Sequence, residues 1–293
     1  MWLVYASLAC LFFGMRGILY QWTSQKPLDR NLLLFGVYLS GTLIAVGLSL
    51  ILQPEWSPAV WIGLLMGVFS FTANAAMYKG FAVGKASLIA ILAGLPPVVV
   101  VIMAYALWGE ALTWGQGAAF LVIISGILLI RYSSDLSLSN LKGVQWGIIT
   151  LISFGITDVA SKQAMLWGGE TIPTLVVMYA TGMVLFFVSW LLSLKKTRAQ
   201  AAQASNEETV PSWSFSKTIL WGLVVGISNI SGMLLILPAF KYGVTGLVSA
   251  VVAMNVLIIL FYARLFLKEK FNKQETAGIV FAFCGMILLR LIG

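Results

Sequence analysis

The chain has 293 residues, of which 60% are hydrophobic and 10% are charged, whereas soluble domains carry roughly 25% charged residues. A soluble fold of this length has too little interior to bury so much apolar surface, so the composition predicts an integral membrane protein. The net charge is +8, but the basic residues stand between apolar segments, where membrane proteins keep Lys and Arg as orientation signals. This distribution argues against nucleic-acid binding.

The sequence contains no histidine, which removes histidine-based acid–base catalysis, Ser–His nucleophiles and His-ligated metals. The two cysteines, Cys10 and Cys284, lie far apart within apolar segments. We interpret them as small buried residues rather than as a disulfide or redox pair. We therefore expect no catalytic residue, no metal site and no cofactor, and we predict that the protein is not an enzyme.

Ten apolar segments follow one another along the chain, each close to the 20 residues or so that span a bilayer. They predict an all-α integral membrane fold with ten transmembrane helices. Most connections are short, but residues 195–217 form a polar linker that we expect outside the membrane. The ten segments are 2–20, 32–52, 59–79, 86–108, 114–131, 143–163, 173–194, 218–238, 245–266 and 274–292.

The two halves of the chain resemble each other. An offset of 159 aligns the third to fifth segments with the eighth to tenth, and an offset of 141 aligns the first two segments with the sixth and seventh. We infer a duplication, with residues 1–131 as the first repeat, 132–142 as a connecting loop and 143–293 as the second repeat. Because each repeat has five helices, the two insert in opposite orientations, as in many transporters. Matching pairs are Gly63 and Gly222, Gly67 and Gly226, Glu110 and Glu269, Tyr38 and Tyr179, and Gly41 and Gly182.

The Lys and Arg residues are divided unequally between the two sides of the predicted membrane. Lys162, Lys241 and Arg290 belong to one side. The other side, which holds the loops after odd-numbered segments, therefore faces the cytoplasm, and both termini are predicted outside. The basic residues of these loops are Lys26, Arg30, Lys79, Lys85, Arg131, Lys142, Lys195, Lys196, Arg198, Lys217, Arg264, Lys268, Lys270 and Lys273.

Polar residues inside the apolar segments are functional candidates, because they are costly in a membrane. We expect Arg16, Tyr20, Asn74 and Tyr78 to line the cytoplasmic half of a substrate cavity. The guanidinium of Arg16 suits the capture of a carboxylate or phosphate. The alternative is that its long side chain extends to the cytoplasmic headgroups.

Asp158 is an acidic residue well inside a predicted helix. Two interpretations stay open: it carries a coupling proton, or it forms a structural pair with Lys162 one helical turn later. Arg16 and Asp158 occupy nearly equivalent positions in the two repeats. Their expected separation in depth is roughly 15 Å, so we do not expect a direct ion pair between them.

Further polar and helix-breaking residues lie near segment centres or ends. Asn229 and Asn255 are expected either to bind substrate or to tie helices together. Pro96-Pro97 interrupts the fourth segment and is a candidate hinge, with a static kink as the alternative. Glu110 and Glu269 end the fourth and ninth segments. We expect them to accept hydrogen bonds at the start of the next helix in a structural role.

Several motifs resemble those of EamA-like proteins in the drug/metabolite transporter superfamily. Phe13-Gly14 resembles their aromatic-Gly motif, and the stretches 109–117 and 123–129 resemble the signature of their fourth and fifth helices. The stretch 268–271, with 285–289, repeats that signature near the end of the chain. The resemblance implies ten helices as an inverted pair and the export or exchange of small metabolites across a bacterial plasma membrane. It also implies cytoplasmic termini, which disagrees with the charge count.

We therefore predict a secondary active transporter that moves a small polar metabolite by alternating access. An amino acid or another carboxylate or zwitterion is the expected substrate, with the lipid bilayer and protons as further partners. The protein is expected as a monomer or homodimer in a bacterial inner membrane. Two alternatives stay open: a proton-coupled exporter of lipophilic or quaternary cations that uses Asp158 and aromatic rings, and a channel or lipid scramblase.

Overall fold

The computed structural model describes residues 1–83, 86–131, 143–201, 213–266 and 273–292, and these residues form helices and connections with no strand. The all-α prediction is confirmed. The elements are α1 (Trp2–Ser24), α2 (Arg30–Leu52), the 3₁₀ helix η1 (Pro58–Trp61), α3 (Ile62–Val83), α4 (Ala86–Ala93), α5 (Pro96–Trp108), α6 (Trp114–Arg131), α7 (Val144–Leu166), α8 (Thr171–Ala201), α9 (Phe215–Tyr242), α10 (Thr245–Ala253), α11 (Asn255–Phe266) and α12 (Lys273–Ile292).

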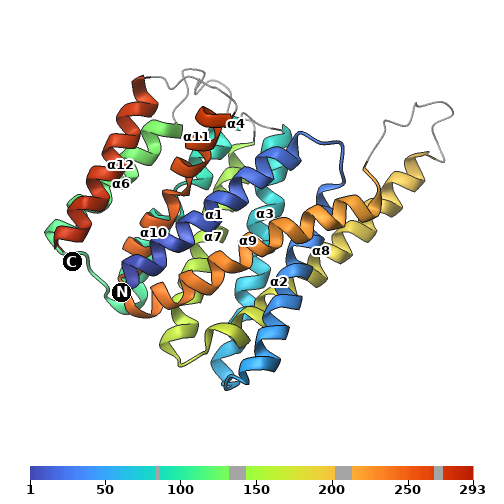
Figure 1. Cartoon of the computed structure of the whole chain (residues 1–293), viewed down its shortest axis with the longest axis horizontal. Coiled ribbons are helices and arrows are strands. Elements are labelled where there is room, and N and C mark those ends of the chain that lie inside the picture. The colour runs from blue at the N-terminus through green and yellow to red at the C-terminus, as the bar shows by residue number, and fades with distance from the viewer. Residues whose placement is uncertain (84–85, 132–142, 202–212, 267–272, 293) are drawn as a thin grey trace.

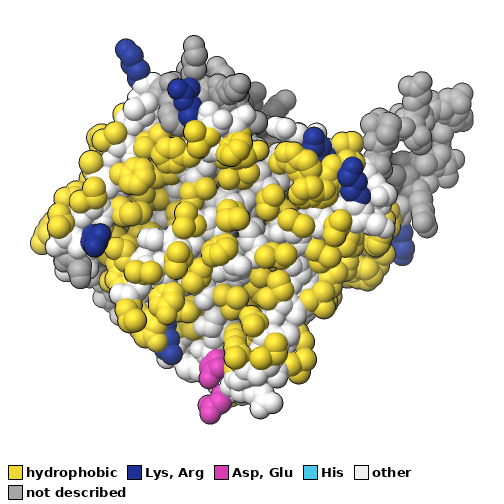
Figure 2. Space-filling model, in the orientation of Figure 1, with side chains coloured by type: hydrophobic (Ala, Val, Ile, Leu, Met, Phe, Trp, Pro, Cys, Tyr) yellow, Lys and Arg dark blue, Asp and Glu magenta, His cyan; other side chains and the backbone are white. Residues whose placement is uncertain are grey.

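The described helices have the length and composition of a multi-pass membrane protein. Eight candidate spans are long and apolar enough to cross a bilayer, with α10 and α11 together forming one of them. The helices Pro96–Trp108 and Trp114–Ile130 are apolar but shorter. Hydrophobic side chains cover most of the face in Figure 2, as expected for a surface that contacts lipid tails.

Two predicted helices are broken in the middle. The segment 86–108 divides into α4 and α5 because Pro96 and Pro97 occupy the first positions of α5, where prolines are tolerated but cannot continue a preceding helix. The segment 245–266 divides into α10 and α11 at Met254. There the Asn255 side chain donates to the Val252 carbonyl at 3.0 Å, and such local bonds compete with helical ones.

Helices extend into both ends of the predicted polar linker 195–217. α8 continues to Ala201 and α9 begins at Phe215, because Ala, Lys, Arg and Gln favour helix even where the chain is polar. The Ser214 side chain caps α9 by accepting from the Lys217 backbone N–H. Residues 202–212 of the linker, the predicted loop 132–142 and Glu269 lie outside the described residues.

The helices pack as a central bundle with one helix pair at its edge. In the bundle, α2 lies against α8 and α9, α3 lies against α7 and α8, and α1 lies against α9. At the edge, α6 and α12 pack along each other (Figure 1). This arrangement leaves the broken helices α4–α5 and α10–α11 between the bundle and the edge pair.

The contact between α2 and α8 is reciprocal. Tyr38 of α2 packs on Gly182 of α8, and Tyr179 of α8 packs on Gly41 of α2. A Cβ at Gly41 would lie 2.2 Å from the Tyr179 ring, and one at Gly182 would lie 2.3 Å from the Tyr38 ring. Only glycine allows this approach, and both tyrosines are fully buried in it.

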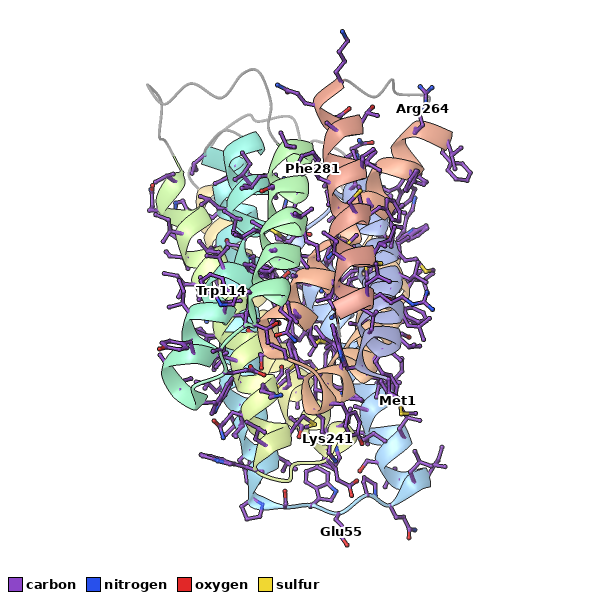
Figure 3. The ribbon with its side chains drawn as sticks, turned by 90° about the vertical axis from the view of Figure 1, so that its left-hand side faces the viewer. Met1, Glu55, Trp114, Lys241, Arg264 and Phe281 are labelled. Atoms are coloured by element: carbon purple, nitrogen blue, oxygen red, sulfur yellow. The ribbon has the colours of Figure 1, made fainter. Side chains whose placement is uncertain are left out.

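The two ends of the molecule differ in charge. Figure 3 shows Met1, Glu55 and Lys241 at one end, here named the terminal end, and Arg264 at the opposite end. In Figure 2 the visible Asp and Glu side chains lie at the terminal end and most of the visible Lys and Arg lie toward the opposite one. We name this second end, which holds Arg264, the basic end.

Candidate functional site

The centre of the bundle contains a cavity of about 130 Å³ where the two broken helices meet. An engineered cavity of about 150 Å³ admits benzene, so this space fits a small solute. Ala93, Pro96 and Pro97 border it from one break, and Val252, Ala253 and Asn255 border it from the other. The remaining lining residues are Phe13, Arg16, Ser70, Phe154, Thr157, Asp158, Met178, Asn229, Met233, Ile236 and Ser249.

Arg16 of α1 supplies a positive charge to this cavity. Its Nη1 donates to Asn229 Oδ1 of α9 at 2.7 Å, and its guanidinium carbon lies 4.6 Å from the centre of the Phe13 ring. The Nε atom is buried and has no hydrogen-bond partner in the described structure. The side chain is thus turned into the bundle, which differs from the alternative that it extends to the headgroups.

Asp158 of α7 supplies the negative charge. Its Oδ2 accepts a hydrogen bond of 2.6 Å from the Ser249 hydroxyl of α10. Lys162, one turn further along α7, instead donates to the Phe240 and Gly243 carbonyls at 2.7 and 2.9 Å. These carbonyls end α9, where the helix dipole attracts a cation. The structural pair of Asp158 with Lys162, one of the two interpretations left open, is therefore not made in the described structure, where each residue bonds to another part of the bundle.

The cavity brings together six of the nine residues proposed from the sequence. Arg16, Asn229, Asn255, Asp158 and the Pro96-Pro97 pair all line it. Asn229 acts at once as a cavity residue and as a tie between helices, because it accepts from Arg16 across the bundle. Asn255 lines the cavity at the break that its own side chain caps.

The other three predicted residues, Tyr20, Asn74 and Tyr78, are not among the residues that line the cavity. The Tyr20 and Tyr78 rings pack edge to face with their centres 6.3 Å apart. Asn74 is buried and donates to the Ser70 carbonyl at 2.8 Å and to the Tyr38 hydroxyl at 3.3 Å. Asn74 therefore contacts Ser70, which lines the cavity, without lining the cavity itself. The rotation of α3 about its axis directs the Asn74 amide to Tyr38, and the sequence alone does not specify that rotation.

Several lining residues were absent from the sequence-based proposal. Phe154 corresponds to Phe13 by the 141 offset, and both rings line the cavity, so the repeat contained a signal for it. Ser70 corresponds to Asn229 by the 159 offset, and both line the cavity, so the repeat contained a signal for Ser70 as well. Ser249 had no such signal, because serines are common in membrane helices and usually bond to their own backbone. Its position at the cavity follows from tertiary packing.

A multi-helix membrane bundle with a cavity between broken helices, lined by a few polar side chains, is an architecture that many transporters share. The model of the EamA-like transporter family matches this chain twice, over residues 1–132 and 141–291. The chain therefore belongs to the EamA-like transporter family of the drug/metabolite transporter superfamily.

Two further comparisons bear on the fold. A crystal structure in which 99% of the chain aligns with 100% of this one has a TM-score of 0.76 and 14% sequence identity. Identity this low supports a shared fold and nothing about substrate. No curated protein matches the chain.

Proposed function

We propose that this protein is a secondary active transporter for a small metabolite that carries a carboxylate, with a zwitterion such as an amino acid as the best fit. The observation that carries the proposal is that Arg16 and Asp158 line one cavity. Arg16 belongs to α1 and Asp158 to α7, the first helix of each half. A solute held between them contacts both halves of the protein at once.

The chemistry of the two charged residues suits a zwitterion. The planar guanidinium of Arg16 matches a carboxylate in geometry and charge, and its buried, unpartnered Nε supplies a donor. Asp158 can accept an ammonium group beside its present partner, Ser249. The volume of about 130 Å³ limits the occupant of this state to a small molecule.

The proposed architecture is ten spans in two inverted repeats. It treats α4–α5 and α10–α11 as one broken span each and α6 as a short span. Reciprocal contacts support the inverted pair. A Cβ on Gly63 would lie 2.5 Å from the Thr174 carbonyl, and a Cβ on Gly222 would lie 2.5 Å from the Leu33 carbonyl; Thr174 is the equivalent of Leu33 by the 141 offset.

Two such halves can exchange conformations, which is the physical basis of alternating access. Proton coupling at Asp158 follows if a proton and the substrate ammonium compete for the same carboxylate. Each then leaves the site when the other binds, so the two move in opposite directions. We propose an orientation with the basic end in the bacterial cytoplasm and both termini outside.

A second candidate, the export of lipophilic cations, is favoured by Asp158 and the two aromatic rings at the cavity. However, Arg16 already lies over the Phe13 ring, which adds a positive charge and occupies a cation–π surface. This observation favours the carboxylate-bearing substrate. A channel or scramblase, as the alternative from another class, predicts currents or lipid exchange without a coupled solute.

The proposal is tested by charge movement in proteoliposomes on a solid-supported membrane, challenged with amino acids, organophosphates, sugars and quaternary amines. We expect a transient current with zwitterions or carboxylates that disappears in Arg16→Ala and persists in the control Arg290→Ala, which removes an exposed charge. Loss of the transient in Asp158→Asn supports coupling at this residue. A quaternary-amine response that survives Arg16→Ala would instead establish the cation exporter.

A further inference from the structure

The helices α5 and α10 both border the cavity and pack against each other. The 159 offset relates Ala86 of α4 to Thr245 of α10, and Pro96 of α5 to Asn255 of α11. The equivalent of the α5–α10 contact is therefore a contact between α11 and α4 at the basic end. Within the described residues, α4 and α11 do not pack against each other in this way. Within the described residues, one of the two equivalent contacts is thus made and the other is not.

We propose that the contact between α5 and α10 is a gate at the terminal end and that Glu110 and Lys162 form a latch that holds this gate closed. Both carboxylate oxygens of Glu110 lie 3.1 Å from the backbone N–H of Thr245, the first residue of α10. Lys162 of α7 holds the Phe240 and Gly243 carbonyls at the end of α9. Its Nζ also lies 3.9 Å from Glu110, so the latch joins the ends of α5, α7, α9 and α10.

Each contact of the latch is a charge placed at a helix end. The carboxylate of Glu110 meets the positive N-terminus of α10, and the ammonium of Lys162 meets the negative C-terminus of α9. Charge-assisted bonds of this kind are stronger than neutral ones, and Lys162 is only 8% exposed. Glu110 follows Gly109, which ends α5 at a φ of 66°. Glu110 thus lies in a connection rather than in a helix, which allows it to leave Thr245 without unwinding α5.

The latch and the cavity both lie along the contact between α7 and α10. Asp158 and Lys162 are one turn apart on α7, and Ser249 and Thr245 are one turn apart on α10, a step of about 6 Å. The Asp158–Ser249 bond at the cavity and the latch, one turn closer to the terminal end, thus join α7 to α10 at successive turns. A ligand that binds the Asp158 carboxylate in place of Ser249 removes one of the two links between α7 and α10 and leaves the latch as the other. This link to the ligand rests on the proposed transport function, whereas the latch itself does not.

The test measures distances between spin labels at both ends of the protein in nanodiscs. The pair Leu107→Cys and Tyr242→Cys reports on the terminal end, and the pair Val83→Cys and Leu265→Cys reports on the basic end. All four side chains are exposed, so labelling disturbs little packing. The background removes the native thiols with Cys10→Ala and Cys284→Ala.

In Glu110→Gln and in Lys162→Met we expect the population with a longer terminal-end distance to rise by about fivefold or more. The basic-end distance should shorten in the same samples, because the two closures alternate. Distances unchanged in both variants would overturn the proposal. So would a widening of both ends together, which is the signature of a purely structural loosening.

Two control variants distinguish the loss of the latch from the loss of any charge at the terminal end. Glu55→Gln removes an exposed carboxylate at the same end and should leave both distances unchanged. Lys162→Arg keeps the cation and should keep the terminal end closed. Glu110→Gln preserves side-chain size, so it tests the latch even if Lys162→Met fails to fold. Because the readout requires no substrate, a negative result here is independent of the transport measurement.

Discussion

At the scale of single residues, the site depends on how an arginine is stabilised inside a membrane helix. A central arginine costs about 3 kcal/mol on insertion scales, and Arg16 recovers part of this through Asn229 and the Phe13 ring. Neither partner neutralises its charge. The guanidinium is therefore held in position and remains positive, which is the condition required for binding a carboxylate.

Two buried asparagines should respond differently to the same substitution. Asn229→Ala removes a hydrogen bond to a charged group at the cavity, a loss of about 1.5–3 kcal/mol, so the KM for a carboxylate substrate should rise by about tenfold or more. Asn74→Ala removes bonds to Ser70 and Tyr38 behind the cavity. It should lower the unfolding temperature with little change in KM. Transport assays and thermal unfolding in detergent, run on both variants, measure the difference; a similar KM in the two would contradict it.

At the scale of elements, the two broken helices create the site. Proline causes the break before α5, and an asparagine side chain marks the break before α11. Both breaks free backbone groups at the depth of the cavity, which is tolerated in a membrane protein only where such groups are surrounded by protein or water. The hinge role of Pro96 and Pro97 stays a prediction, because one conformation is described.

The close approach of α2 and α8 provides a test of helix packing. In Gly41→Ala the new methyl group meets the Tyr179 ring, and overpacking of this kind costs about 1–3 kcal/mol. In Gly47→Ala, on the same helix, the methyl group meets open space, and the helix gains about 0.5–1 kcal/mol. We therefore expect Gly41→Ala to unfold at a lower temperature than the parent protein and Gly47→Ala at an equal or higher one. Equal unfolding temperatures for the two variants would contradict the described contact.

At the scale of the whole molecule, the proposed orientation rests on the charges at the two ends. Basic loops stay in the cytoplasm during insertion, and Arg264 lies at the end opposite Met1, Glu55 and Lys241 (Figure 3). The two ends also differ in packing: α5 packs against α10, whereas the equivalent contact between α4 and α11 is not made among the described residues. If the basic end is cytoplasmic and the α5–α10 contact is the proposed gate, this conformation corresponds to one closed toward the outside.

Labelling of intact cells tests this orientation. In a background with Cys10→Ala and Cys284→Ala, a membrane-impermeant thiol reagent should label Glu55→Cys and leave Lys26→Cys unlabelled until the cells are opened. The physical reason is that Glu55 follows α2 at the terminal end, whereas Lys26 follows α1 at the other end. The reverse pattern would support cytoplasmic termini, as the family resemblance implies.

The sequence by itself determined the class of the protein and the extent of most helices, and it predicted the equivalence of the two halves. Apolar segments of membrane length specify helices, because the backbone must satisfy its own hydrogen bonds in lipid. The Gly and Tyr pairs that repeat at an offset of 141, such as Gly41 and Gly182, could be predicted to matter because their spacing is a property of the chain. The charge of Arg16 and Asp158 inside apolar segments indicated the site for the same reason.

Only the tertiary structure decided which polar groups meet. Asn74 and Asn229 look alike in the sequence, yet one faces a tyrosine hydroxyl and the other faces Arg16. Asp158 bonds to Ser249, 91 positions away, rather than to the nearby Lys162, and Glu110 caps α10 rather than α6, the next helix. The physical reason is that helix periodicity sets neighbours within a helix, whereas rotation and depth relative to other helices depend on the packing of the whole bundle.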